Sequence, residues 1–184
     1  MNGIKNKIEN SLKKLEKWIE NKNYKGYEPF DGLSSFLHPL TFKIQYLERV
    51  LQQLDRQSPI NIRPLIGVKP QESTKGSGYM AWGYLSIFKI TGATQYKEKA
   101  IKLLNWLDEN KAPNYSYHSW GNHFKFTSRV GKLPKYEPII VWTSLIGQAF
   151  LDAYEILNEK KYLEIANSIC NWILDLPREQ TDSG

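Results

Sequence analysis

The chain has 184 residues, of which 41% are hydrophobic, and it carries a formal net charge of +6. This size and composition are typical of a single globular domain with a sizeable core, which we predict over residues 1–184. No apolar run approaches the length of a membrane span, the single cysteine excludes an internal disulfide, and the charged first ten residues lack the apolar core of a signal peptide. We therefore expect a cytoplasmic protein.

Lysine supplies most of the positive charge, and many lysines follow the first predicted helix at the spacing of a solvated helix face: Lys5, Lys7, Lys13, Lys14, Lys17 and Lys22. No cluster of lysine and arginine is joined to a known nucleic-acid docking motif, so solubility explains the charge better than nucleic-acid binding does. An acidic polysaccharide partner suits the same charge.

The first half of the chain predicts two amphipathic helices. The first runs to Lys17-Trp18-Ile19, with its apolar residues at helical spacing from Ile4 onward. The second runs from about Leu40 to Leu54 and places four apolar residues on one face, namely Ile44, Leu47, Leu51 and Leu54. Residues 58–68 contain two prolines and predict a short helix or an irregular segment, and Lys75 to Gly78 predict a flexible approach to the next helix.

The second half of the chain contains a repeated helical hairpin. Residues 84–107 align with residues 150–173 at a constant offset of 66, and each copy has a tight polar turn at the same place. Gly92 and Asn158 stand in these turns and are the residue types that best tolerate the left-handed conformation that ends a helix. Apolar residues over 141–157 form a wide stripe, and those over 162–173 form a narrower one, which predicts an inner and an outer helix.

Three helices end in the same pattern around Trp18, Trp106 and Trp172, which predicts three equivalent loops at one end of the fold. These loops are residues 21–33, residues 111–137 and the segment from 176 onward; the tripeptide Tyr-Glu-Pro occurs at 27–29 and at 136–138. We predict an all-α array of antiparallel helical hairpins that forms part of an α/α toroid, incomplete at its C-terminus. Since such hairpins bury their apolar faces only against neighbours, a second copy or a missing C-terminal half is expected to complete it.

The loop from Ala112 to His123 is rich in aromatic residues and holds two of the three histidines. It predicts an aromatic floor for a sugar ring, with His118 as a proton-transfer group and His123 as a hydrogen-bonding group. Further predicted sugar contacts are Tyr27, Tyr115, Tyr117, Trp120, Tyr136 and Trp142. A packed loop whose aromatic rings seal the end of the helical array is the alternative interpretation.

Glu28 and Asp31 are candidate carboxylates for acid–base chemistry at a glycosidic bond, and Glu137 is a third. Asp31 precedes Gly32 and a serine pair, so capping of the next turn is the commoner role for it. Glu137 precedes Pro138, which suggests a negative charge at a helix start. There is no HExxH helix, paired cysteine ligand or phosphate-binding glycine loop, so we expect no metal and no cofactor.

Three segments give the chain a resemblance to a known family: residues 26–33, residues 58–65 and residues 117–121. They resemble exopolysaccharide and capsule biosynthesis proteins of the α/α-toroid type, whose first loop carries a Tyr-Asp-Pro-Tyr-Asp-Gly-like stretch, with Glu28 and Phe30 as conservative changes here. The resemblance implies a toroid similar to six-hairpin glycosidases and uronyl epimerases, and it implies that this chain corresponds to the N-terminal half.

Two functions follow as hypotheses. One is an enzyme that acts on a polysaccharide or its lipid-linked precursor as a hydrolase, lyase or epimerase, with the carboxylates and His118 in proton transfer. The other is a non-catalytic glycan-binding or scaffold module that uses the same aromatic residues. A fragment without activity is a weaker third interpretation.

Overall fold

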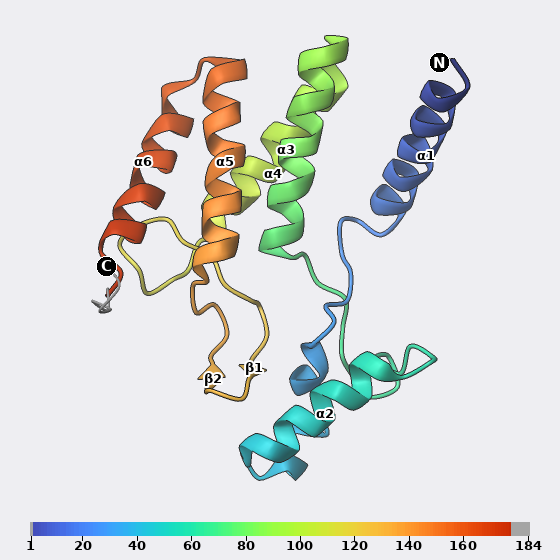
Figure 1. Cartoon of the computed structure of the whole chain (residues 1–184), viewed down its shortest axis with the longest axis vertical. Helices are drawn as coiled ribbons and strands as arrows, with labels where there is room; N and C mark the ends of the chain where they lie inside the picture. Colours follow the sequence, from blue (N-terminus) through green and yellow to red (C-terminus); the bar gives the residue numbers. More distant parts are fainter. Residues whose placement is uncertain (1, 178–184) are drawn as a thin grey trace, which may run out of the picture. The chain divides into compact units, whose positions relative to one another are not determined.

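The computed structural model describes residues 2–177, with the side chains of Asn2 and Lys5 excepted (Figure 1). The elements in chain order are α1 (Asn2–Asn21), η1 (Asp31–Ser34), η2 (His38–Thr41), α2 (Gln45–Gln57), α3 (Thr74–Thr91), α4 (Thr94–Glu109), β1 (Phe126–Thr127), β2 (Lys132–Leu133), α5 (Ile140–Leu157) and α6 (Lys160–Leu174). The predicted all-α class is confirmed, since β1 and β2 form only a two-stranded ribbon. Closure into a toroid stays a prediction.

The chain divides into two compact units. Unit 1 comprises Met1–Ser73 and Lys125–Lys132, and unit 2 comprises Thr74–Phe124 and Leu133–Gly184. Unit 1 therefore includes the tip of the long connection between α4 and α5, although it lies far from the rest of unit 1 in the sequence.

Unit 2 consists of the two predicted hairpins, in which α3 packs on α4, α5 packs on α6, and α3 and α5 pack on each other (Figure 1). The predicted repeat is visible in the packing of its aromatic rings. Tyr84 lies 6.0 Å from Tyr96 between ring centroids, and the residues 66 positions later, Phe150 and Tyr162, lie 6.2 Å apart. Leu85, Leu104 and Phe150 are fully buried, so these hairpins have an apolar core.

The turns of the two hairpins share one geometry. Gly92 has a φ of 67° and its N–H donates to Phe88 O at 2.8 Å. Asn158 has a φ of 57° and its N–H donates to Tyr154 O, also at 2.8 Å. Each of these hydrogen bonds joins an N–H to the carbonyl four residues earlier, as in helices that end with a residue in the left-handed conformation. The predicted role of Gly92 and Asn158 is therefore confirmed.

One boundary in unit 2 was predicted wrongly. Residues 75–78 are not an approach to the helix but its first turn, because α3 begins at Thr74. A Cβ at Gly78 would lie 2.7 Å from Cγ1 of Ile146, so glycine is needed there for α3 and α5 to approach closely. The two glycines that suggested flexibility therefore sit inside a helix, and one of them serves packing.

In unit 1, the second predicted helix starts later than expected. Residues 38–41 form the separate turn η2, and Phe42 and Lys43 follow with positive φ angles of 49° and 58°, so α2 begins only at Gln45. The predicted irregular alternative for residues 58–68 is confirmed, with turns but no helix, and Gly67 adopts a φ of 78°.

The two faces of α2 have the reverse of the usual polarity. Its buried residues are Glu48, Gln52 and Asp55, which follow one helical stripe. Most residues of the predicted apolar face point the other way: Leu47 and Leu54 are exposed, as is Ile44 directly before the helix, whereas Leu51 is half-buried. The sequence predicted the apolar face correctly, but the described chain leaves that face uncovered.

Candidate functional site

In unit 2, two connecting segments meet at the beginning of the inner helices. Ile139 N–H donates to Trp120 O at 2.9 Å, Tyr136 N–H donates to Asn122 O at 2.6 Å, and Gly121 pairs with Pro138 in an antiparallel bridge. The Thr74 hydroxyl, in the first residue of α3, donates to Gly121 O at 3.1 Å. We call Thr74, Lys75 and residues 112–123 and 134–142 the loop end of unit 2.

Gly121 makes this close approach of the two segments possible. A Cβ at this position would lie 1.9 Å from the carbonyl oxygen of Glu137, so no other residue fits without movement of the backbone. The approach fixes the position of Glu137 relative to the loop that carries the aromatic residues.

The loop end contains a hydrogen-bonded phenol and carboxylate. The Tyr115 hydroxyl donates to Oε1 of Glu137 at 2.8 Å. This hydrogen bond, followed by burial and the negative charge of Glu137, raises the pKa of Tyr115 above its usual value. Tyr115 therefore stays a neutral donor and orients the carboxylate.

Further aromatic side chains lie at the same end. The Lys75 ammonium lies 4.9 Å from the ring centroid of Trp142, in the first turn of α5, as a cation–π contact. Tyr136 is exposed and has a φ of 63°, a left-handed conformation that is uncommon for a residue with a side chain. Tyr117 and His123 are half-buried, and the His123 ring meets the edge of Phe124 at 5.1 Å.

Trp120 does not fit its predicted role as a sugar contact. It is fully buried, its indole N–H donates to Leu107 O at 2.9 Å, and its ring stacks on Phe150 at 5.9 Å. A ring in this position has no exposed face, so Trp120 matches the alternative interpretation of a residue that seals the helical array.

His118 is held by two outer helices. Its Nε2 lies 2.9 Å from Oδ1 of Asp108 in α4, and its Nδ1 lies 2.9 Å from the hydroxyl of Ser168 in α6. With the proton assigned to Nε2, the Ser168 hydroxyl donates to Nδ1 and accepts the backbone N–H of His118. Both ring nitrogens of His118 therefore have a hydrogen-bond partner, and its predicted proton-transfer role stays a prediction.

No sequence pattern predicted this Asp–His–Ser arrangement, because its members lie on three separate segments of the chain. These hydrogen bonds fasten the loop that carries His118 to α4 and α6.

In unit 1, the predicted carboxylate Asp31 is buried in an ion-pair cluster. Arg63 Nε donates to its Oδ1 at 2.8 Å, and the Glu28 backbone N–H donates to its Oδ2 at 2.9 Å. Asp31 thus neither caps the next turn nor faces solvent. Arg63 also donates to Glu28 O at 3.1 Å and lies 5.8 Å from the ring of Tyr27, so it organises the whole predicted Tyr-Glu-Pro loop.

Asp55 is the second carboxylate of this cluster. Its Oδ2 lies 3.0 Å from Arg63, an ion-pair distance without hydrogen-bond geometry. Burial, together with the neighbouring Asp31 carboxylate, raises the pKa of Asp55 to about 6 against the attraction of Arg63. The sequence analysis missed Arg63. It is the single charged residue in segment 58–65, and a lone charge of this kind could have indicated a buried ion pair.

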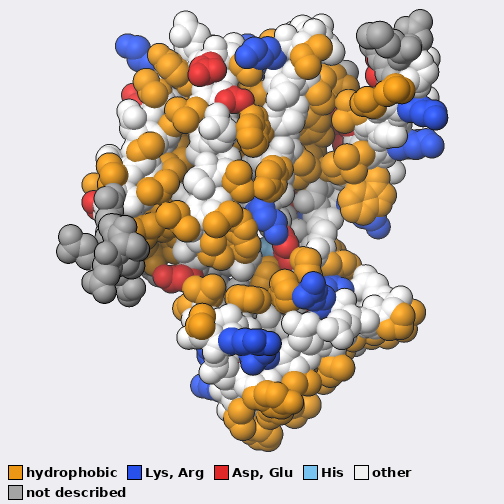
Figure 2. Space-filling model, viewed as in Figure 1, with side chains coloured by type: hydrophobic (Ala, Val, Ile, Leu, Met, Phe, Trp, Pro, Cys, Tyr) orange, Lys and Arg blue, Asp and Glu red, His pale blue; other side chains and the backbone are white. Residues whose placement is uncertain are grey.

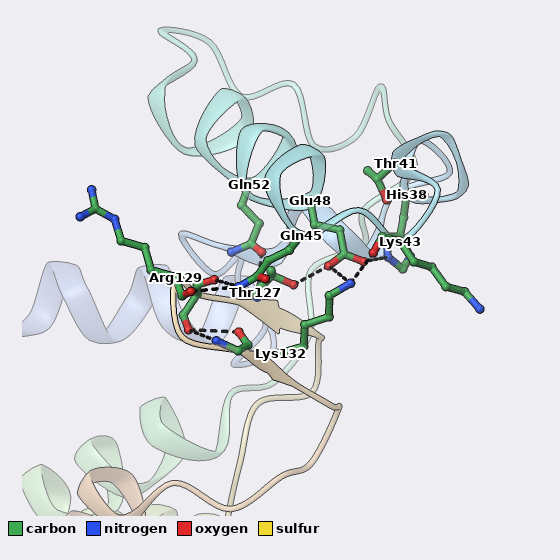
Figure 3. A network of polar contacts seen from close by, with 11 residues as sticks. His38, Thr41, Lys43, Gln45, Glu48, Gln52, Thr127, Arg129 and Lys132 are labelled. Carbon is green, nitrogen blue, oxygen red and sulfur yellow. Dashed lines mark hydrogen bonds and ion pairs between the residues drawn. The ribbon is translucent and has the colours of Figure 1, made fainter.

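The remaining buried carboxylate, Glu48, joins α2 to the ribbon of residues 125–132 (Figure 3). Lys132 Nζ lies 2.8 Å from its Oε2, the Thr127 hydroxyl donates to the same oxygen at 2.7 Å, and His38 Nε2 lies 3.2 Å from its Oε1. Burial opposes the ionisation of Glu48, but these three partners together outweigh it and lower its pKa. Gln52 accepts the Thr127 N–H at 2.9 Å.

The loop end of unit 2 thus contains eight of the predicted site residues, of which Tyr115 and Glu137 are in direct contact: Tyr115, Tyr117, His118, Trp120, His123, Tyr136, Glu137 and Trp142. Glu28, Asp31 and Tyr27 belong to unit 1, and their predicted meeting with Glu137 at one edge stays a prediction. Among the described residues, no group of three His, Cys, Asp or Glu side chains could hold a metal ion.

None of the helices in the described part of the chain combines the length and the apolar composition that a membrane span needs. Comparison with protein-family models, with curated proteins and with solved structures finds no match.

Proposed function

We propose that the chain binds an acidic poly- or oligosaccharide at the loop end of unit 2, as a carbohydrate-active protein of polysaccharide biosynthesis. The observation that carries the proposal is the Tyr115–Glu137 hydrogen bond, which belongs to the same loop end of unit 2 as the Trp142–Lys75 contact at the start of α5. The family resemblance of the sequence supplies the biosynthetic context.

These four side chains provide the kinds of contact that bind a sugar. An oriented carboxylate accepts hydroxyl protons, a neutral phenol holds it in place, and the face of an indole packs on the C–H groups of a pyranose ring. The Lys75 ammonium next to the indole adds a positive charge, which suits a sugar that carries a carboxylate.

Binding is favoured over catalysis by the state of the predicted catalytic groups. Asp31 is buried and paired with Arg63. Glu137 is the remaining carboxylate of the predicted set that lies with the aromatic residues of unit 2.

A catalytic function is the second candidate, and the same hydrogen bond favours it. A phenol held on a carboxylate can pass a proton to a leaving glycosidic oxygen, with Glu137 as the group that keeps Tyr115 oriented. In that case the chain would cleave the bound glycan, as a hydrolase with water as the nucleophile or as a lyase with a base that takes the C5 proton of a uronic acid; an epimerase breaks no glycosidic bond and would need a different step.

Calorimetric titration with a panel of uronic-acid and neutral oligosaccharides tests both candidates. We expect uronic-acid oligosaccharides to bind, Trp142→Ala to abolish detectable binding, and Tyr115→Phe to weaken it about fivefold, the size of one hydrogen bond. Glu155→Gln and Tyr154→Phe, at the other end of α5, are matched controls and should leave affinity unchanged.

The same samples are then analysed for products. If wild type makes a product and Glu137→Gln binds without making it, the chain is an enzyme; if wild type makes none, it is a binding module. Equal behaviour of Glu137→Gln and Glu155→Gln would contradict the proposed site in either case.

A further inference from the structure

Unit 1 leaves an apolar surface exposed on α2. Tyr46, Leu47, Val50 and Leu54 are all exposed, and they follow one another at helical spacing on the side opposite Glu48, Gln52 and Asp55. We call these four residues the apolar face of α2. Leu40, Phe42 and Ile44, in the segment before the helix, are exposed as well. Figure 2 shows hydrophobic side chains gathered over the part of unit 1 that contains α2.

The orientation of α2 is held by ion pairs and not by its apolar residues. Glu48 is bound by Lys132, Thr127 and His38, and Asp55 is paired with Arg63 (Figure 3). Rotating the helix to bury Leu54 would expose these carboxylates and break every one of these contacts. A buried charge that loses its partner costs several kcal/mol, on the order of 3–5. The apolar face is therefore a fixed outer surface of unit 1.

The charge of the chain is concentrated in the same unit. Unit 1 contains 15 lysines and arginines against 8 aspartates and glutamates, a formal charge of +7. Unit 2 contains 10 against 11, a formal charge of −1. Three of the acidic side chains of unit 1, Asp31, Glu48 and Asp55, are buried, so its surface is more basic than the sum suggests.

The N-terminal helix repeats this combination. Ile4, Ile8, Leu15 and Trp18 follow one stripe of α1 and are exposed, with Trp18 at 58%. The lysines of α1 lie at other positions of the helix. Exposed leucine, isoleucine and tryptophan beside lysine are the composition of helices that lie in a lipid–water interface.

We propose that unit 1 binds the surface of an anionic lipid bilayer, with the apolar face of α2 inserted at the level of the headgroups. Charge complementarity selects this occupant. Two copies of unit 1 would bring formal charges of +7 together, which disfavours self-association, whereas an anionic bilayer attracts the lysines and accepts the apolar side chains. This proposal concerns unit 1 and does not depend on the sugar site proposed for unit 2.

Sedimentation of the full chain with lipid vesicles tests the proposal. We expect binding to vesicles of phosphatidylcholine mixed with phosphatidylglycerol, weak binding to phosphatidylcholine alone, and release as salt is added. Leu54→Glu should weaken partitioning about tenfold or more, since it removes an inserted leucine and adds repulsion from the lipid.

Ile90→Glu is the matched control, because Ile90 is an exposed apolar residue of unit 2, at 84%, and receives the same change of charge. Circular dichroism checks that both variants fold, and Leu54→Gln provides a second variant without added charge. Equal vesicle binding by Leu54→Glu and Ile90→Glu, or equal binding to charged and uncharged vesicles, would overturn the proposal. So would a dimer in vesicle-free buffer that Leu54→Glu dissociates, because the apolar face would then be a contact between copies.

Discussion

The two units of this protein each contain a helix with an apolar and a polar side, but they bury opposite sides of it. In unit 2, α5 turns Ile146, Phe150 and other apolar residues inward, and polar side chains lie mainly on its exposed side. In unit 1, α2 turns Glu48, Gln52 and Asp55 inward and exposes Leu47 and Leu54. The difference teaches that amphipathic spacing fixes which residues share a face, whereas the neighbours decide which face is buried.

The stabilising interactions differ accordingly. Unit 2 relies on apolar packing between α3, α4, α5 and α6, a contribution that grows with buried area and needs no exact partner. Unit 1 relies on a small number of buried ion pairs, in which each charge depends on its partner. Four changes test this contrast, from the largest expected effect to the smallest.

The largest effect is expected from a cavity in unit 2. Phe150→Ala removes a fully buried ring and should lower the free energy of unfolding by about 3–5 kcal/mol. Leu54→Ala removes an exposed side chain of α2 and should change it by less than about 0.5 kcal/mol. Urea denaturation followed by circular dichroism measures both. A comparable loss in the two variants would mean that the apolar face of α2 is covered.

Loss of Arg63 should affect unit 1 nearly as strongly. Arg63→Ala leaves Asp31 and Asp55 buried together without their positive partner, which should cost about 3 kcal/mol. Arg129→Ala removes an exposed arginine of the same unit and serves as the control. Proteolysis within residues 26–73 would report the loss. Resistance equal to that of the control would show that the cluster contributes little.

A change of pH should affect the two buried acids of α2 in opposite directions. The folded protein keeps a proton on Asp55 up to about pH 6, whereas the unfolded chain releases it near 3.8. The folded state therefore binds more protons in this interval, and Asp55 makes unit 1 more stable as the pH falls from about 7. The lowered pKa of Glu48 gives stability that is present above 4.5 and is lost as the pH falls through its folded pKa.

Unfolding measured across this range isolates the contribution of Asp55. In Asp55→Asn, the gain in stability on going from about pH 7 to about pH 5 should be absent, since no proton is taken up there. A gain of the same size in wild type and variant would assign the pH dependence to another group.

The smallest effect is expected at the hairpin turns of unit 2. Gly92→Ala forces a Cβ into a left-handed conformation and should cost about 1 kcal/mol. Asn158→Gly removes the Cβ from the same conformation at the equivalent turn. It should leave the stability of the protein unchanged or raise it by roughly a few tenths of a kcal/mol. Thermal melting of the two variants measures the difference. A Gly92→Ala variant that loses no stability, or an Asn158→Gly variant that loses about 1 kcal/mol, would show that the left-handed conformation does not act equally at the two turns.

The sequence was sufficient for much of unit 2. An offset of 66 residues found both hairpins, and residue type alone found the left-handed ends at Gly92 and Asn158. The sequence-based prediction was wrong for the first turn of α3, because Gly78 was taken as a sign of a flexible segment. In the structure, its lack of a side chain lets Ile146 approach α3. Close approach between helices is a tertiary property that no local pattern expresses.

The candidate site was predictable only in part. The Tyr-Glu-Pro tripeptide pointed to Glu137, but its hydrogen bond with Tyr115 depends on the pairing of Gly121 with Pro138. Trp120 could not be distinguished from an exposed aromatic residue by sequence, since its burial depends on Phe150. Arg63 and Lys132 were missed because ion pairs between distant segments leave no periodic signal.

The inward orientation of the polar side of α2 can be tested most directly by thiol labelling. In a Cys170→Ala background, which removes the one exposed native thiol, single cysteines are placed at Leu54 and at Gln52. We predict that Leu54→Cys reacts with a maleimide as fast as the unfolded chain, whereas Gln52→Cys is strongly protected until urea unfolds the protein. Protection of position 54 together with fast labelling of position 52 would contradict the account.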